Sequence, residues 1–176
     1  MRIGMCGTVS VGKTTLVNAL KELDEFKGYN FATERSKYLM LLGIPLNTDS
    51  TLKGQTIFLA ERCSELMYNN VITDRTLIDV MAFTLSAKSI PYQDKEIFEL
   101  YASEFIREYD YIFYISPEGI DIENNGIRET DSDYRNLIDQ NIKSLINKHG
   151  HKCSSFHQIS GSTDDRIQQI VNIIGF

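Results

Sequence analysis

A glycine-rich stretch near the start of the chain, "GTVSVGKTT" at positions 7–15, has residue types and a spacing that suit phosphate chemistry. Gly7 and Gly12 are separated by four residues, and Lys13 and Thr14 follow directly. In a P-loop of this spacing, backbone N–H groups and the start of a helix cradle phosphate oxygens. The pattern predicts that Lys13 reaches the β- and γ-phosphates and that the Thr14 hydroxyl ligates Mg²⁺. The residues predicted to bind the nucleotide here are Gly7, Val9, Ser10, Val11, Gly12, Lys13, Thr14 and Thr15.

Charged residues follow two further strand-like runs. Asp74 and Arg75 end the apolar run in "NVITDRT", and Glu34 follows the run in "FATERSKYL". Ligands of an open parallel sheet lie beyond the carboxyl ends of its strands, so all three side chains are expected beside the phosphates. Asp74 suits Mg²⁺, directly or through water, and Arg75 offers a planar fork to a phosphate. Glu34 suits the base that accepts a proton from a substrate hydroxyl, and Asp74 is the alternative for that role.

Two later segments complete the predicted site. The polar stretch "ENNGIRETDSDYR" at 123–135 belongs to a predicted flap over residues 117–134, in which Arg128 closes over the transferring phosphoryl group. Closure of such a flap excludes water, so that transfer can exceed hydrolysis. In "QISGSTDDR" at 158–166, Gly161, Ser162 and Thr163 lie between a strand and a helix. These three residues are expected near the adenine side of the nucleotide.

These residues need a framework of alternating strands and helices. Short apolar or β-branched runs predict strands at 2–6, 29–33, 71–74, 111–116 and 153–159. Apolar residues at helical spacing predict helices at 13–26, 35–42, 51–68, 76–88, 94–108, 134–148 and 163–174. Strands separated by helices imply crossover connections and a parallel sheet covered on both faces. The predicted fold class is therefore α/β.

The composition is that of one soluble domain over residues 1–176. No apolar run approaches about 18 residues and the start lacks a secretory signal pattern, so neither a membrane span nor export is expected. Cys6, Cys63 and Cys153 are scattered without metal or disulfide spacing, which fits a reducing cytoplasm. The net charge of −6 argues against a broad basic face for nucleic acid, although a small basic pocket for phosphates stays compatible with it.

The segments quoted above, with "VITDRTLIDVMAF" and "NNGIRETDSDYRNLID", occur in the order found in P-loop kinases related to nicotinamide riboside kinases. The chain also resembles phage-encoded deoxynucleoside and deoxynucleotide kinases. The resemblance covers nearly the whole chain and implies a three-layer α/β/α fold around a five-stranded parallel sheet, with ATP as donor and Mg²⁺ as cofactor.

The resemblance also implies roles for individual residues. It implies that Lys13 and Thr14 serve the phosphates and the metal, that Asp74 and Arg75 act at the reacting end, and that Arg128 acts in the lid. The carboxylate after the second strand, here Glu34, often acts as the base in such kinases. The lid departs from the pattern, because it has Asn124-Asn125-Gly126 where related proteins often have acidic residues before the glycine. This departure leaves the acceptor open.

A P-loop alone indicates nucleotide binding, and three functions stay open. The leading interpretation is an ATP-dependent kinase for a small nucleoside- or nucleotide-like acceptor. A kinase acting on DNA or RNA, at a modified base or a 5′ end, is weakened by the net acidity. A regulatory NTPase is disfavoured because the sequence has no N-K-x-D guanine-reading motif. A homodimer is compatible with the sequence.

The segment between the second and third strands is expected to carry the acceptor specificity. An aromatic residue and an amide suit the stacking and reading of a base. The candidates are Tyr38, Leu41, Leu42, Gln55, Phe58, Glu61 and Arg62.

Overall fold

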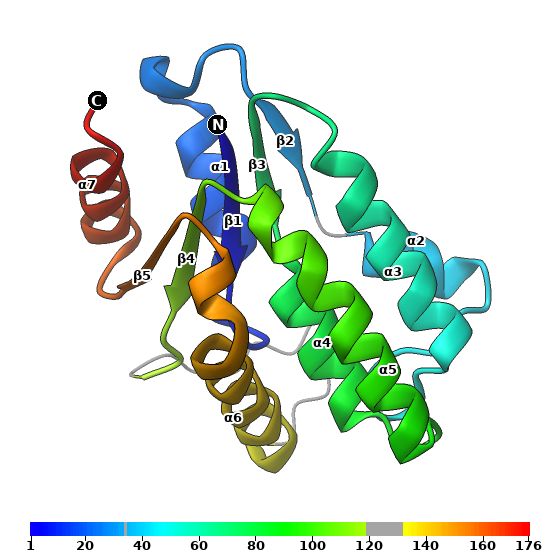
Figure 1. Cartoon of the computed structure of the whole chain (residues 1–176). Helices are drawn as coiled ribbons and strands as arrows, with labels where there is room; N and C mark the ends of the chain where they lie inside the picture. The colour runs from blue at the N-terminus through cyan, green and yellow to red at the C-terminus, as the bar shows by residue number, and fades with distance from the viewer. Residues whose placement is uncertain (34, 119–131) are drawn as a thin grey trace.

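The computed structural model describes residues 1–33, 35–118 and 132–176. Its strands form one sheet with the order β2-β3-β1-β4-β5, and every neighbouring pair is parallel (Figure 1). The strands are β1 (Arg2–Cys6), β2 (Asn30–Ala32), β3 (Val71–Asp74), β4 (Tyr111–Ile115) and β5 (Ser155–Ile159). Each lies where a strand was expected, which confirms the α/β class and the five-stranded parallel sheet.

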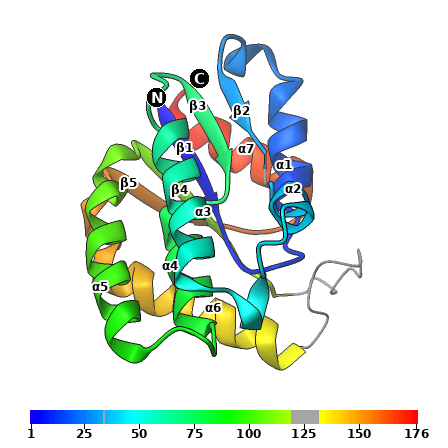
Figure 2. The ribbon, with the colours of Figure 1, turned by 90° about the vertical axis from the view of Figure 1, so that its right-hand side faces the viewer.

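The helices lie in two layers, one on each face of the sheet (Figures 1 and 2). Helices α1 and α7 share a core with one face, and α3, α4, α5 and α6 share a core with the other. None of the described helices is long and apolar enough to cross a membrane. The helices are α1 (Lys13–Lys21), α2 (Ser36–Leu41), α3 (Leu52–Glu65), α4 (Leu77–Ser86), α5 (Tyr92–Ser103), α6 (Ser132–His149) and α7 (Thr163–Ile174).

Strand β4 shows why these sequences form a sheet buried on both faces. Ile112 and Tyr114 pack toward the α3–α6 layer, whereas Phe113 and Ile115 pack toward α1 and α7. All four are at most 2% exposed. Because successive side chains of a strand point to opposite faces, a strand covered on both sides must be apolar throughout. This packing fixes the carboxyl edge of the sheet, from which the loops of the site emerge.

Two helices end well before their predicted ends, and a 3₁₀ segment covers part of the remaining range in each case. Helix α1 ends at Lys21, and Asp24–Phe26 forms a separate 3₁₀ turn; α5 ends at Ser103 and is followed by a 3₁₀ segment over Glu104–Glu108. The buried ring of Phe26 still packs edge-on against Tyr29. A 3₁₀ turn repeats every three residues, so it continues to turn apolar residues inward where the α-helix has stopped.

Candidate active site

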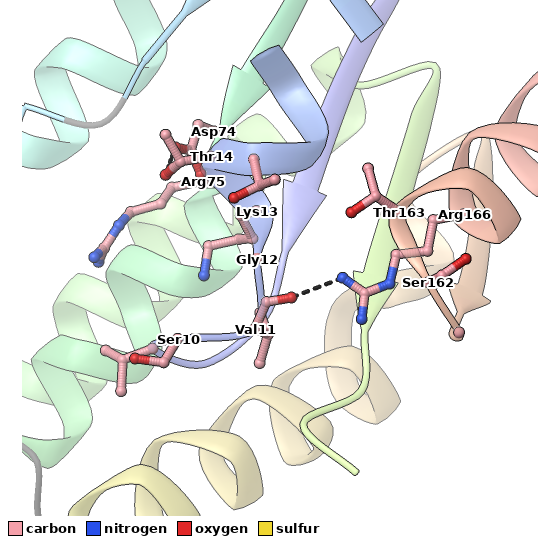
Figure 3. Close-up of a pocket in the computed structure, with 13 residues that line it drawn as sticks. Ser10, Val11, Gly12, Lys13, Thr14, Asp74, Arg75, Ser162, Thr163 and Arg166 are labelled. Carbon is pink, nitrogen blue, oxygen red and sulfur yellow. Dashed lines mark hydrogen bonds between the residues drawn. The ribbon is translucent and has the colours of Figure 1, made fainter. Parts of the chain in front are cut away.

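A cavity of about 270 Å³ lies at the carboxyl edge of the sheet, beyond the ends of β1, β3 and β5 (Figure 3). It is the crevice in which ligands of open α/β sheets bind. Every lining residue except Arg166 was predicted for the site from the sequence, and Gly7 is a predicted residue that does not line it. The lining residues are Val9, Ser10, Val11, Gly12, Lys13, Thr14, Thr15, Asp74, Arg75, Gly161, Ser162, Thr163 and Arg166.

The P-loop has backbone conformations that favour glycine. Gly12, the N-cap of α1, has a φ of 82°. A side chain at Gly7 would place its Cβ 2.9 Å from the carbonyl oxygen of Ile115 on the neighbouring strand, so only glycine allows the loop to approach β4 this closely. Helix α1 begins at Lys13, and its first residues line the cavity. The positive end of the helix therefore lies beside the space available for phosphates.

Lys13 is held inside the loop that it follows. Its Nζ donates hydrogen bonds to the carbonyl oxygens of Gly7, at 2.6 Å, and Thr8, at 2.8 Å. The side chain is 8% exposed, and its Nζ lies 4.0 Å from Oδ1 of Asp79. Burial lowers the pKa of the Lys13 ammonium, and the Asp79 carboxylate opposes that shift. The loop thus holds the amino group of Lys13 at its centre.

Asp79 has a role that the sequence did not predict. Its fully buried carboxylate accepts hydrogen bonds from the backbone N–H of Gly7, at 3.1 Å, and from the N–H and hydroxyl of Thr76, both at 2.7 Å. The Thr76 contacts form the capping box of α4, so Asp79 ties the first P-loop glycine to the helix after β3. The sequence signal for this role is a single carboxylate, Asp79, within the otherwise apolar segment "LIDVMAF".

Thr14 and Asp74, the two predicted metal ligands, lie together. The Thr14 hydroxyl donates to Oδ2 of Asp74 at 2.5 Å, and Asp74 is 1% exposed. In the described part of the chain, no three His, Cys, Asp or Glu side chains gather as a metal site. One hydroxyl and one carboxylate fit Mg²⁺, which takes few protein ligands and fills its remaining positions with water and substrate phosphates. Thr14 and Asp74 are the residues that would hold it.

Arg75 lies on the cavity wall next to Asp74 (Figure 3). Its φ of 136° is outside the regions that non-glycine residues normally occupy. Its guanidinium carbon lies 4.8 Å from the ring centroid of Phe83 on α4. Strained backbone of this kind persists where the surrounding structure over-determines it, and such residues cluster at functional sites. The observation supports a functional role for Arg75.

The start of α7 forms the opposite wall of the cavity. Gly161 has a φ of 93°, and Ser162 caps the helix. The Ser162 hydroxyl oxygen accepts from the backbone N–H of Asp165 at 3.2 Å, and the Asp165 carboxylate accepts from the backbone N–H of Ser162 at 2.9 Å. This capping box fixes the predicted residues Gly161, Ser162 and Thr163 in the part of the cavity wall that the start of α7 forms.

Arg166 is the lining residue that sequence reasoning missed. It is 6% exposed, and its Nη1 donates to the carbonyl oxygen of Val11 in the P-loop at 2.8 Å (Figure 3). The signal for it lies in the helical pattern, because Arg166 and Ile170 are the buried residues of α7 and are one turn apart. A charged residue on the buried face of an amphipathic helix needs a hydrogen-bond or ion-pair partner, so its position in the pattern indicates a specific contact.

The predicted acceptor residues of α3 are largely buried. Gln55 is 3% exposed and Arg62 is 2% exposed. Nη2 of Arg62 lies 2.6 Å from Oε1 of Glu65, and Nη1 of Arg35 lies 3.3 Å from Oε1 of Glu61. Burial raises the pKa of the Glu65 carboxyl to about 7, although the Arg62 charge opposes the shift. Charged groups are therefore concentrated on α3, although none of its residues is among those that line the cavity.

The other acceptor candidates are arranged differently. Phe58 packs against the core cluster of the α3–α6 layer. Tyr38, Leu41 and Leu42 are exposed by 49%, 82% and 59%. Gln55, Glu61 and Arg62 are the polar candidates, and their side chains are mostly buried.

Two predicted catalytic residues, Glu34 and Arg128, lie outside the described residues, as does most of the predicted lid. The end of the lid segment is fixed at α6. The Thr8 hydroxyl of the P-loop donates to the carbonyl oxygen of Arg135 at 3.0 Å, and Arg135 is 8% exposed. The segment that carries Arg128 therefore leads directly into a helix anchored on the P-loop.

Comparison with known proteins gives one family and a set of similar folds. Residues 2–166 match the AAA domain family. No curated protein matches the chain. It is similar to deoxyadenosine kinase from M. mycoides with bound dCTP, at 18% identity and a TM-score of 0.68 over 99% of this chain and 98% of that one.

Two further structures show the same fold. NadR protein in complex with NAD and AMP-PNP has 16% identity and a TM-score of 0.73 over 99% of this chain and 49% of that chain. YorR protein from Bacillus subtilis, in complex with phosphorylated GDP, has 14% identity and a TM-score of 0.58 over 99% and 95%. At these identities the likeness establishes the fold, and it confirms at that level the expected P-loop kinase architecture. Since the family match spans residues 2–166, the chain belongs to the AAA domain family.

Proposed function

We propose that this protein is an ATP- and Mg²⁺-dependent phosphotransferase that moves the γ-phosphate of ATP to a hydroxyl or phosphate of a nucleoside- or nucleotide-like acceptor. The observation that carries the proposal is the convergence of the P-loop, the Thr14–Asp74 pair and Arg75 on one cavity. A phosphate cradle beside a carboxylate and an arginine provides what phosphoryl transfer needs, which is positioning and charge stabilisation.

The contents of the similar structures support this class of reaction. The deoxyadenosine kinase holds dCTP, and NadR holds NAD and AMP-PNP. NadR has also been solved in complex with NR. Each of these proteins binds a nucleotide or nucleoside compound on the same fold, so a small acceptor of that kind is the first choice for this chain.

In the proposed reaction, the acceptor oxygen forms a bond to the γ-phosphorus while the bond to the β–γ bridging oxygen breaks. The proton of an acceptor hydroxyl passes to a carboxylate, for which Glu34 and Asp74 are the candidates. Lys13 and Arg75 stabilise the negative charge that develops on the phosphoryl oxygens. Mg²⁺, when bound by Thr14 and Asp74, supplies further neutralisation of phosphate charge.

The acceptor is assigned to the side of the crevice next to α3. Gln55 and Arg62 are seven residues apart, two helical turns, and both belong to the buried face of the helix. Among the described residues, Nε and Nη1 of Arg62 have no hydrogen-bond partner. An amide and a guanidinium edge together offer donors and an acceptor that match the edge of a nucleobase. Because both side chains are at most 3% exposed, this contact requires α3 or its neighbours to move when the acceptor binds. This pair favours a nucleoside or nucleotide over a simpler alcohol.

The predicted lid completes the proposal from the sequence. Arg128, in the segment 117–134, is assigned to close over the transferring group and exclude water. The anchoring of α6 on the P-loop through Thr8 and Arg135 supports a lid that ends beside the phosphates.

A panel of acceptors tests the proposal. Consumption of ATP is measured without acceptor, with nucleosides, nucleotides and nicotinamide riboside, and with DNA and RNA oligonucleotides that carry a 5′ hydroxyl. The expected result is ATP consumption that depends on a small acceptor, with label from γ-³²P-ATP recovered on it. Transfer restricted to oligonucleotides would replace the proposal with a nucleic-acid kinase. Hydrolysis that no acceptor accelerates would replace it with an NTPase.

A further inference from the structure

Arg166 is a buried cation on the wall of the cavity, behind the P-loop. It comes from α7, the last helix, and contacts residues more than 150 positions earlier in the chain. Its Nη1 donates to the carbonyl oxygen of Val11, and the same nitrogen would lie 3.2 Å from a Cβ added at Gly12. The guanidinium therefore packs closely against the last turn of the loop, and a side chain at position 12 would require it to shift by a few tenths of an ångström.

The charge of Arg166 is not balanced inside the protein. Among the described residues, no carboxylate lies within salt-bridge distance of it, and its Nε has no hydrogen-bond partner. Burial lowers the pKa of the guanidinium, and no neighbouring charge opposes that shift. An arginine buried without a counter-ion destabilises a folded protein, because the charge loses its hydration without gaining a partner. Such a group calls for an anion that arrives from outside.

The cavity next to Arg166 is the one assigned to the phosphates of ATP. Resting on that proposed function, we propose that Arg166 is a positioning residue of the P-loop that lowers the stability of the empty protein and increases its affinity for polyphosphate. The hydrogen bond to Val11 orients the loop, and the unbalanced charge raises the positive potential over it. Bound phosphates then provide the counter-charge that the protein lacks.

The burial of Arg166 argues for charge and against base stacking. A guanidinium that stacks on adenine must present a planar face, but this side chain is only 6% exposed. Its charge acts over several ångströms whether or not it touches the ligand. The ligand feature that Arg166 recognises is therefore the polyphosphate, and the base should contribute nothing to its effect.

Two substitutions separate charge from packing. Arg166→Met removes the charge and keeps much of the side-chain volume, and Arg166→Lys keeps the charge. Arg107→Gln is the matched control, because Arg107 is an exposed arginine outside the site. For each variant, the dissociation constants of ATP and of inorganic tripolyphosphate are measured by calorimetry, and Tm is measured with and without ligand.

We expect Arg166→Met to weaken ATP and tripolyphosphate equally, by at least about tenfold, since a contact to a charged group has this order of effect. The rise in Tm on adding either ligand should shrink in Arg166→Met and persist in Arg166→Lys. Arg107→Gln should match the wild type in every measurement. If Arg166 were merely structural, both substitutions would lower the Tm of the empty protein and leave the dissociation constants unchanged. That result would overturn the proposal.

Two other outcomes are equally decisive. If ATP binding weakens while tripolyphosphate binding does not, Arg166 contacts the nucleoside part and the charge proposal is wrong. If the wild type binds neither ligand, the proposed function itself is wrong. If instead the wild type and Arg166→Met bind both ligands with equal affinity, only the role of Arg166 is rejected and the proposed function stands.

Discussion

The P-loop, which lines the cavity, and the α3 side, to which we assign the acceptor and which does not line it, are made from different chemical groups. The P-loop presents main-chain groups and the start of a helix, and its one central side chain, Lys13, is bonded to two carbonyl oxygens of the loop itself. The α3 side consists of the side chains of Gln55 and Arg62, which are buried in the packing of the helix, and of Glu65, which is paired with Arg62.

This difference has a physical consequence for specificity. Main-chain N–H groups are the same in every sequence, so a loop built from them recognises what all nucleotide donors share, the phosphates. Side chains differ in shape, charge and hydrogen-bonding pattern, so a wall built from them can distinguish one acceptor from another. Changes on the two sides should therefore act on different kinetic constants.

The largest effect is expected at the centre of the P-loop. Lys13→Ala should lower kcat/KM by about 100-fold or more, because one preorganised charge contact in the transition state is worth about 3 kcal/mol. The control is Lys21→Ala, an exposed lysine at the other end of α1. Steady-state kinetics and a circular-dichroism melt test it. A folded variant that keeps more than a tenth of the wild-type kcat/KM would remove Lys13 from the reaction.

The next effect concerns the metal pair. Asp74→Asn replaces a charged oxygen ligand with a neutral one, so activity should require more Mg²⁺ and kcat should fall on the order of 10- to 100-fold. Titration of activity with Mg²⁺ measures both changes. Asp24→Asn, in the exposed turn after α1, is the control. If both variants titrate like the wild type, Asp74 does not hold the metal.

On the α3 side, the expected effect is smaller and confined to the acceptor. Gln55→Leu removes an amide at similar volume, so KM for the acceptor should rise about fivefold, the value of one hydrogen bond. The dissociation constant of ATP should stay at its wild-type value. Lys53→Gln, on the exposed face of the same helix, should change neither. Equal losses for ATP and acceptor would show that the two sides are not independent.

The smallest effect is the pH dependence of stability from Glu65. Its pKa is raised by burial to about 7, above the ordinary value of 4.5, so the folded state holds the proton more tightly than the unfolded chain. The stabilising contribution is therefore present below the ordinary value and is lost as the pH rises to about 7. Between about pH 5 and pH 8, the free energy of unfolding of the wild type should fall relative to Glu65→Gln by on the order of 1 kcal/mol.

Urea unfolding of both proteins across that pH range measures the difference. If the difference in unfolding free energy is the same at every pH, Glu65 does not titrate in this range. For Lys13→Ala, the difference in unfolding free energy from the wild type should stay constant between about pH 5 and pH 8, because both proteins retain Glu65. The pH dependence would then belong to the α3 side and not to the P-loop.

Local patterns were sufficient to predict the elements of the fold. Each predicted strand lies within a residue or two of an observed one, because strands buried on both faces must be continuous apolar runs. The ends of α1 and α5 were predicted less well. Apolar residues such as Phe26 and Ile106 are buried from 3₁₀ segments, and helical spacing in the sequence does not distinguish the two kinds of turn.

The sequence by itself determined the P-loop, the Asp74–Arg75 position and the start of α7, because each depends on the order of residues within one short segment. Only the tertiary structure decided which distant side chains meet them. Asp79 reaches Gly7 across 72 positions, and Arg166 reaches Val11 across 155. The reason is that the hydrogen-bond partners of a buried polar side chain are the groups that the packing brings to it, and those groups are set by how the helices cover the sheet.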